Sequence, residues 1–340
     1  FRSSIGEYFD NVKNIGFNTV YVHVRAFGDA YYDSELFPAT DNFDGKVGTK
    51  NSFDALQVMI EEAHDRNLSI HAWVNPMRLM TDNNMKSVPN EYIIKKWYDN
   101  SKYKGTYIVK SGDKWYLNPA YSKVTDLIAD GVAEIVANYK VDGIQIDDYF
   151  YPTTNASFDK TAYNNSSDGL SLSAWRIKNV NTMVKKIYKA AHNANPNIVF
   201  GISPQGSVEN NYNELYADVK TWCKEKGYCD YILPQVYYGF KNVALPYKTT
   251  ILEWQEMCSS GNVKLVIGLA AYKIGTVDTY AGTSAKNEWR NNSDIIARQM
   301  ALAKELDLYG GVAIYRYDSL FKPNKDVAAQ VSKELGNIKK

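Results

Sequence analysis

The sequence is poor in cysteine, with three residues of this type, so not all of them can pair within one chain. We therefore expect no disulfide framework, although a single bond between Cys223 and Cys229 is compatible with the pattern. The cysteines lack a C-x-x-C spacing, and the four histidines form no H-x-H or H-E-x-x-H pattern. The sequence therefore predicts no metal site and no cofactor.

An excess of either charge is also missing, because 39 Lys and Arg residues face 38 Asp and Glu residues, for a net charge of +1. Nucleic-acid-binding domains carry a basic face, so a nucleic-acid partner is not expected. The longest apolar run, residues 263–272, is shorter than the roughly 20 residues that cross a bilayer. We therefore predict no transmembrane segment in this chain.

Tyrosine and tryptophan are abundant, with 27 and 7 residues. One interpretation is a codon bias that enriches tyrosine, asparagine and lysine together. The other is that the rings line a groove for sugars, which offer flat apolar faces. Their positions in the fold decide between the two.

Helical periodicity alternates with short apolar runs along the whole chain, which predicts a parallel sheet covered by helices. The expected helices are residues 3–15, 52–66, 122–138, 172–194, 212–226, 247–258, 293–306 and 324–335. The expected strands are residues 18–25, 69–75, 143–147, 198–203, 231–237, 264–271 and 311–317. We predict a single α/β domain over residues 1–340, a (β/α)8 TIM barrel whose first strand is missing from this chain. An open, doubly wound sheet is the alternative, although no Gly-rich phosphate turn follows any strand.

The long loops all follow expected strands, whereas the connections from helix to strand are short. The long loops are residues 28–51, 76–119, 149–171, 239–246 and 273–292. A barrel places its active site on this C-terminal side of the strands. Residues 106–109 and 114–117 predict a small hairpin within one of these loops.

Alternation along the strands predicts which side chains face the barrel interior. Polar or aromatic residues recur at the inward positions near the strand ends, and we expect them to meet at one mouth. They are Arg25, Asn75, Asp147, Ser203, Gln235 and Tyr237.

Two adjacent carboxylates, Asp147 and Asp148, end a buried strand and lead directly into aromatic residues. One interpretation is structural, with an aspartate paired to Arg25 or Arg78. The other is glycoside hydrolysis, with Asp147 as nucleophile or stabiliser of the cation and Asp148 as the acid. Neighbouring residues on a regular strand point apart, so both reach one substrate only if the chain bends there. Other candidates for the second carboxylate are Asp29, Glu35, Glu209 and Asp318.

The run D-G-I-Q-I-D-D-Y-F-Y-P at residues 142–152 resembles the hallmark of the glycosyl-hydrolase-like family ten proteins of bacterial envelopes. Further segments match the same family in order. They are residues 16–21, 24–30, 71–76, 115–119, 201–204, 233–237 and 267–273. The resemblance covers nearly the whole chain. It implies an eight-fold barrel, and the family includes a divisome-associated glycosidase that cleaves peptide-free peptidoglycan strands.

The resemblance and the strand positions together imply a glycoside hydrolase of the cell envelope or extracellular space that acts on a glycan polymer. We predict Asp147 and Asp148 as catalytic. The predicted substrate-binding residues are Arg25, Asp29, His71, Asn75, Arg78, Trp115, Tyr149, Tyr151, Ser203, Gln235, Tyr237, Tyr238, Tyr272 and Lys273.

Two alternative functions remain open. The first is a non-catalytic carbohydrate-binding barrel, and the second is a metal-dependent hydrolase that uses His23 and His71. The motif also resembles, more distantly, that of chitinase-type barrels: Asp142, Gly143 and Asp147 match, but Tyr149 stands in place of the acid, so the acid is not carried over. Substrate assistance by an N-acetyl group, with Asp147 and Tyr237 orienting the amide, is compatible with this likeness.

Overall fold

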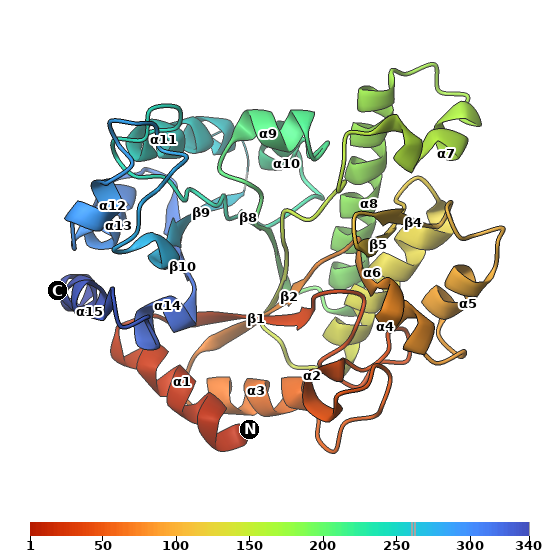
Figure 1. The fold of residues 1–340 in the computed structure, drawn as a ribbon, viewed down its shortest axis with the longest axis horizontal. Helices are drawn as coiled ribbons and strands as arrows, with labels where there is room; N and C mark the ends of the chain where they lie inside the picture. Colours follow the sequence, from red (N-terminus) through yellow and green to blue (C-terminus); the bar gives the residue numbers. More distant parts are fainter. Residues whose placement is uncertain (260, 262, 340) are drawn as a thin grey trace. The chain divides into compact units, whose positions relative to one another are not determined.

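The computed structural model describes residues 1–259, 261 and 263–339 (Figure 1). The chain divides into two compact units. The first unit consists of Phe1–Phe9, Asn18–Phe200 and Asn210–Asp218. The second unit consists of Asp10–Phe17, Gly201–Glu209 and Val219–Lys340. Because this division does not decide whether the units fold independently, the single domain stays a prediction.

Three parallel strands form the sheet of the first unit, in the order β1-β2-β6. They are β1 (Thr19–Arg25), β2 (Ser69–Val74) and β6 (Gly143–Ile146). The aliphatic residues predicted to face the helices in β2 and β6, such as Ile70 and Ile144, are fully buried. Successive strands are neighbours, as in a barrel, whereas a doubly wound sheet reverses its order at a switch point.

The long helices of this unit begin at side-chain caps or bury an apolar face. They are α3 (Ala55–His64), α6 (Ser122–Asn138) and α8 (Leu172–Ala194). Ser171 caps α8 by accepting a hydrogen bond from the Ala174 amide, so this helix has the predicted bounds. Helices α6 and α8 lie side by side (Figure 1). Their packing buries Ile128 and Val184.

The long loop between β2 and β6 contains a small antiparallel sheet in the order β3-β5-β4. Its strands are β3 (Arg78–Thr81), β4 (Ile108–Ser111) and β5 (Lys114–Leu117). The predicted hairpin is therefore confirmed as β4 and β5, and β3 is an addition that brings Arg78 into a strand. Short helices flank these strands: α2 (Asp41–Asp44), α4 (Asp82–Ser87) and α5 (Ile93–Asp99).

The second unit carries the strand order β7-β8-β9-β10, and β7 begins at the end of the first unit. The strands are β7 (Val199–Ile202), β8 (Tyr231–Ile232), β9 (Lys264–Ala270) and β10 (Tyr309–Tyr315). Strand β8 is much shorter than predicted, because Pro234 has no amide hydrogen for the ladder. Gln235 restores contact through isolated bridges to Gln205 and Gly268.

The predicted helix over residues 212–226 is wrong, because Tyr216 adopts a left-handed conformation (φ 56°) that interrupts it. It is replaced by α9 (Val208–Asn213) and α10 (Val219–Lys224). The remaining elements are α1 (Arg2–Asn14), η1 (Ala156–Phe158), α7 (Lys160–Asn164), α11 (Tyr247–Cys258), η2 (Ala271–Lys273), α12 (Glu288–Asn291), α13 (Ile295–Ala303), α14 (Tyr317–Phe321) and α15 (Ala328–Ile338).

The three cysteines are buried free thiols of the second unit. The Sγ atom of Cys223 lies 3.5 Å from that of Cys258, whereas the Cys229 thiol faces the Trp222 carbonyl. The neighbour of Cys223 is therefore Cys258 and not Cys229, the partner that the sequence suggested. Sequence spacing could not show this, because α10 and α11 bring the two residues together.

Candidate active site

Asp147 and Asp148 form a hydrogen-bonded carboxyl pair directly after β6. The strand ends at Ile146, and the Phe150 amide then donates a hydrogen bond to the Asp148 carbonyl, 2.9 Å away, in a tight turn. The side chain of Asp148 acts on the Asp147 carboxyl through its charge and a side-chain hydrogen bond. That both carboxylates reach one substrate stays a prediction.

The pKa of Asp147 is raised well above its usual value, first by burial of the carboxyl and then by the charge of Asp148. The Asp148 amide and the Arg78 charge act in the opposite direction and offset only part of the increase. Asp147 therefore holds a proton at a pH where an ordinary aspartate is ionised. This favours Asp147 as the acid, the reverse of the roles expected from the sequence.

Asp147 and Asp148 interact with each other, so the proton on Asp147 depends on the charge of Asp148. Retaining glycosidases separate their carboxyl groups by about 5–5.5 Å and inverting enzymes by about 6.5–9.5 Å. Among the other candidates, Glu35, Glu209 and Asp318 are exposed, and buried Asp29 accepts a hydrogen bond from the Phe27 amide at 2.8 Å.

Polar and aromatic side chains line the inward positions of β1 and β2. The rings of His23 and Trp73 stack with centroids 3.9 Å apart. The Trp73 indole donates to Asn75 Oδ1 at 3.1 Å, and Asn75 donates to the Ala26 carbonyl at 3.1 Å. Burial, followed by the charge of Arg78, lowers the pKa of His23 to about 4, so this imidazole is neutral at physiological pH. The hydrogen bond from Trp73 fixes the side-chain amide of Asn75, a residue that the sequence predicts at the mouth of the barrel.

His71 lies lower on the same face and packs against Gly143, the first residue of β6. A Cβ atom at Gly143 would lie 2.5 Å from the His71 ring, so only glycine fits at this contact. Burial lowers the pKa of His71 to about 4. These contacts describe a neutral packing residue, and substrate binding by His71 stays a prediction.

Arg78 and Tyr149 meet beside the carboxyl pair. The guanidinium carbon lies 3.9 Å from the centroid of the Tyr149 ring and 4.7 Å from that of Phe27. Tyr149 is 40% exposed, so one apolar sugar-sized surface is available next to Asp147 and Asp148. The sequence predicted Arg78 and Tyr149 as substrate-binding residues. It did not predict Phe27, because this residue lies in a loop, where strand alternation does not apply.

The prediction that Arg25 lines the site is wrong. Its guanidinium lies over Phe37 at 4.3 Å and donates to the Ile128 carbonyl of α6, and the residue is 1% exposed. A register shift in β1 between His23 and Arg25 breaks the strict alternation. The arginine therefore points toward α6, where Gly131 leaves room for it.

Two rings that were expected to stack on glycan are also buried. Trp115 is 5% exposed, and its indole donates to Asp82 Oδ1 at 3.1 Å. Tyr151 is 1% exposed and packs edge-on against Phe158 and Tyr216. Both predictions of exposed stacking rings are wrong, because the loops that carry them fold onto their own apolar cores.

In the second unit, three tyrosines form a partly exposed cluster. The rings of Tyr237 and Tyr315 lie nearly parallel with centroids 6.1 Å apart, and Tyr272 packs edge-on against both. Tyr272 and Tyr315 are 45% and 37% exposed. Lys273 supports the cluster by donating to the Tyr237 carbonyl and to Asp278 Oδ2, each at 2.7 Å. Tyr315 was not among the predicted site residues, although it follows the same alternation as Tyr237.

The other predicted residues of this unit lie near the same strand ends. Gln235 donates to the Ser203 carbonyl at 3.1 Å, and burial raises the pKa of Tyr238 to about 12. The Tyr238 carbonyl accepts a hydrogen bond from Gln299. Direct contact of these three residues with a substrate stays a prediction.

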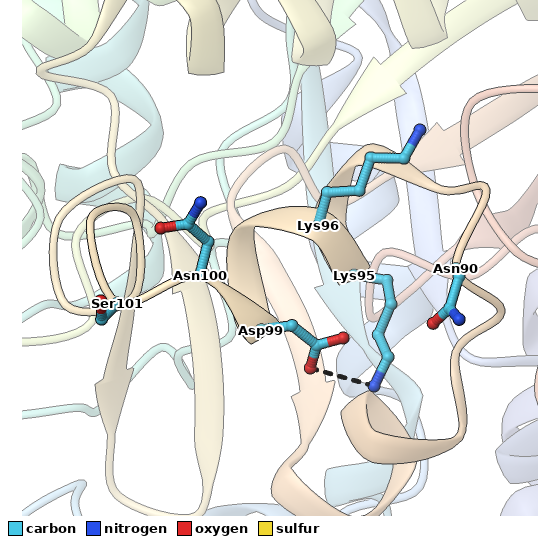
Figure 2. A pocket seen from close by; sticks show the side chains of 6 residues that line it. All are labelled: Asn90, Lys95, Lys96, Asp99, Asn100 and Ser101. Carbon is cyan, nitrogen blue, oxygen red and sulfur yellow. Dashed lines mark ion pairs between the residues drawn. The ribbon is translucent and has the colours of Figure 1, made fainter.

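A pocket of about 530 Å³ lies elsewhere, at α5 (Figure 2). Polar side chains line it, including Lys95 and Asp99, which form an ion pair at 3.2 Å. None of the predicted site residues contributes to this pocket. Within residues 1–259, 261 and 263–339, no group of three or more His, Cys, Asp or Glu residues is arranged to hold a metal ion. No helix in this described part is long and apolar enough to cross a membrane.

Two solved structures with a similar fold are described as glycoside hydrolases. The glycoside hydrolase domain of PgaB (BpsB) from Bordetella bronchiseptica matches with a TM-score of 0.62 at 13% identity, covering 98% of this chain and 93% of that chain. A GH113 β-1,4-mannanase matches with a TM-score of 0.51 at 9% identity, covering 99% and 91%. These likenesses define the fold class as a TIM barrel.

Sequence comparison identifies the family. The model of the glycosyl hydrolase-like 10 family matches residues 2–283. Glycosyl hydrolase DigH of Escherichia coli (strain K12) is 31% identical over 340 residues, which cover 94% of this chain and 76% of that protein. Glycosyl hydrolase YngK of Bacillus subtilis (strain 168) is 31% identical, covering 96% and 65%. The chain belongs to the glycosyl hydrolase-like 10 family and is a glycoside hydrolase.

Proposed function

We propose that this glycoside hydrolase cleaves an amino-sugar polymer, namely peptide-free glycan strands of peptidoglycan, at the carboxyl pair Asp147 and Asp148. The observation that carries the proposal is the hydrogen bond between these two side chains, with Asp147 buried and its pKa raised. A glycosidase needs such a protonated carboxyl beside the leaving oxygen. The hallmark motif at residues 142–152 supports the same polymer class.

Asp147 donates the proton to the leaving glycosidic oxygen, and Asp148 keeps that proton on Asp147 until the substrate is in place. An amino sugar also carries its own nucleophile, the carbonyl oxygen of the N-acetyl group, as substrate-assisted glycosidases use. One carboxyl unit is then sufficient for the chemistry. This is consistent with two carboxyls that touch each other.

Aromatic surface holds the sugar rings in this proposal. Tyr149 presents a 40% exposed ring beside the carboxyl pair. It offers an apolar face to a pyranose ring and a hydroxyl to its substituents. Because peptidoglycan lies outside the cytoplasmic membrane, the proposal also places the protein in the cell envelope or the extracellular space.

The test is product analysis by mass spectrometry after incubation with purified peptidoglycan, with and without prior removal of the stem peptides by an amidase. We expect cleavage products from the peptide-free strands and few or none from the intact polymer. The Asp142→Asn variant is the matched control, because Asp142 sits at the opposite end of β6 and pairs with His64 at 3.0 Å. It should yield the wild-type products, whereas Asp147→Asn should yield none. Glycan that binds without any cleavage would instead indicate a non-catalytic binding barrel.

A further inference from the structure

Arg78 has unused hydrogen-bonding capacity beside the carboxyl pair. Its Nε atom is buried and has no hydrogen-bond partner among the described residues. No carboxylate in the described part of the chain lies within 4.0 Å of its guanidinium nitrogens as an ion pair. A buried donor that stays unpaired is costly, so a partner from outside the chain would stabilise this arrangement.

The two aromatic rings set the direction in which that partner approaches. The Tyr149 and Phe27 rings lie 3.9 Å and 4.7 Å from the guanidinium carbon, so the flat group stacks on them. All N–H bonds of a guanidinium lie in its plane, and stacking leaves only its edges for a ligand. A planar edge with two parallel N–H bonds fits a carboxylate.

The acidic groups around Arg78 do not fill this role. Asp147 and Asp148 hydrogen-bond to each other, and Asp113 is bonded to Lys114 at 2.8 Å. The positive charge of Arg78 lowers the pKa of Asp147 and of Asp113 through electrostatic attraction. His23 is neutral at physiological pH and contributes no charge. The guanidinium therefore has Tyr149 as its direct partner, while its Nε atom has none among the described residues.

Another arginine of the same unit shows how this chain satisfies a purely structural guanidinium. Arg176 binds Asp159 through Nε and Nη2, at 2.9 Å and 2.7 Å, and also donates to the carbonyls of residues 153–155. Its side chain is fully buried. Arg78 is half-buried, and its Nε atom has no acceptor among the described residues. The contrast points to a ligand.

We infer that Arg78 binds a carboxylate carried by the sugar unit next to the carboxyl pair, so that the enzyme selects an acidic saccharide. The inference rests on the proposed function and specifies its substrate. Two sugars carry this chemistry: a muramic unit, whose lactyl carboxylate is free only when no stem peptide is attached, and a uronic acid. An attached peptide turns the lactyl carboxylate into a neutral amide that cannot accept a charge-assisted pair of hydrogen bonds.

The experiment compares wild type and Arg78→Gln on four glycans. These are peptide-free peptidoglycan, the same strands with their carboxyls converted to methylamides, chitin oligomers and oligogalacturonate. We expect kcat/KM of the wild type to fall about 10- to 100-fold when the lactyl carboxylate is amidated, the usual value of a charge-assisted hydrogen-bond pair. Arg78→Gln should lose the same factor on the carboxylated strands and little on the amidated strands or on chitin. Activity on oligogalacturonate alone would assign the carboxylate to a uronic acid.

Arg298→Gln is the matched control, because Arg298 also lies over an aromatic ring, Phe240, but already pairs with Asp294 at 3.2 Å. This variant should behave as wild type on every glycan. Arg78→Lys should recover only part of the preference, because an ammonium lacks the flat two-pronged edge. An equal loss by Arg78→Gln on carboxylated and amidated strands would overturn the inference, since Arg78 would then act on the carboxyl pair alone.

Binding separates the inference from the proposed function. Kd is measured with the Asp147→Asn variant for the peptide-free and the amidated strands. Tighter binding of the carboxylated strands that disappears in the Asp147→Asn, Arg78→Gln double variant supports carboxylate recognition, even if the wild type cleaves none of the glycans. Equal Kd values for both strands contradict it, whatever the turnover.

Discussion

Two regions of the first unit contain the same three residue types and use them in opposite ways. In one region, Arg176 binds Asp159 and lies 5.0 Å from the ring of Tyr151, and the ion pair is fully buried. In the other, Arg78 lies on Tyr149 beside Asp147 without an ion pair of its own in the described chain. The first set is satisfied internally and holds a loop on α8. The second leaves a carboxyl with a raised pKa, an exposed ring and a guanidinium Nε without a partner among the described residues, which is what distinguishes the candidate site from the core.

The largest expected effect separates the aspartates of the candidate site, Asp147 and Asp148, from the core aspartate Asp159. Asp147→Asn and Asp148→Asn should each lower turnover on glycan at least 100-fold, because general acid catalysis contributes about 10²–10⁴-fold. Asp159→Asn should leave the turnover per folded molecule unchanged and lower stability by about 3–5 kcal/mol, the usual cost of breaking a buried pair. Turnover and thermal unfolding are measured on all three variants. Asp147→Asn with more than about a tenth of wild-type turnover would show that this carboxyl is structural.

Tyr151→Ala tests the core side of the comparison. The ring is 1% exposed, so its removal should leave a cavity and cost about 3–5 kcal/mol of unfolding free energy. The affinity of the protein that remains folded should not change. Chemical denaturation and glycan binding at a low temperature measure the two quantities. Weaker glycan binding with unchanged stability would instead indicate that Tyr151 contacts the substrate.

Tyr149→Ala tests the site side, two residues earlier in the chain. The ring is 40% exposed, so its loss should change stability by less than about 0.5 kcal/mol. Glycan affinity should fall roughly fivefold, as expected for the loss of about 1 kcal/mol of ring contact. Isothermal titration with an oligosaccharide reports the affinity. Tyr212→Ala, which removes an exposed ring outside the predicted site, is the control.

The smallest effect is on the pH dependence of stability. The pKa of Asp147 is raised in the folded state, so between its usual value near 4 and the raised value the folded protein binds more protons than the unfolded chain. Stability therefore falls as pH rises through this window. The Asp147→Asn variant has no carboxyl to ionise, so it does not lose stability as pH rises. Its melting temperature should exceed that of the wild type by a few degrees at neutral pH, and the two should approach each other near pH 4. Parallel melting curves across this pH range would contradict the raised pKa.

Local sequence patterns were sufficient for most of the secondary structure. The alternation of helices with seven parallel strands is as predicted, and α8 has its predicted bounds, because a serine cap and an apolar stripe are local signals. The errors occur where one residue changes the backbone locally. Pro234 shortens β8 and Tyr216 interrupts the helix predicted at 212–226.

The site shows the same division. Asp147 and Asp148 are predicted from the sequence, since carboxylates at the end of a buried strand stand out against the surrounding apolar residues, and their catalytic role stays a prediction. Arg25 was misplaced because a register shift turns it toward α6, and Tyr151 because its loop folds onto Phe158 and Tyr216. Strand alternation holds only while the ladder is regular, and a loop has no period from which burial follows.

By itself, the sequence determined the family, the order of elements and the acidic motif, all of which depend on residues close together in the chain. Only the tertiary structure decided that burial and Asp148 raise the pKa of Asp147, and that Arg78 stacks on Phe27 and Tyr149. It also decided that Arg176 is satisfied while the Nε atom of Arg78 is not. These properties depend on burial and on hydrogen-bond partners distant in sequence. Desolvation and partner geometry exist only after the chain has packed, which is why the same three residue types form a core in one place and a site in another.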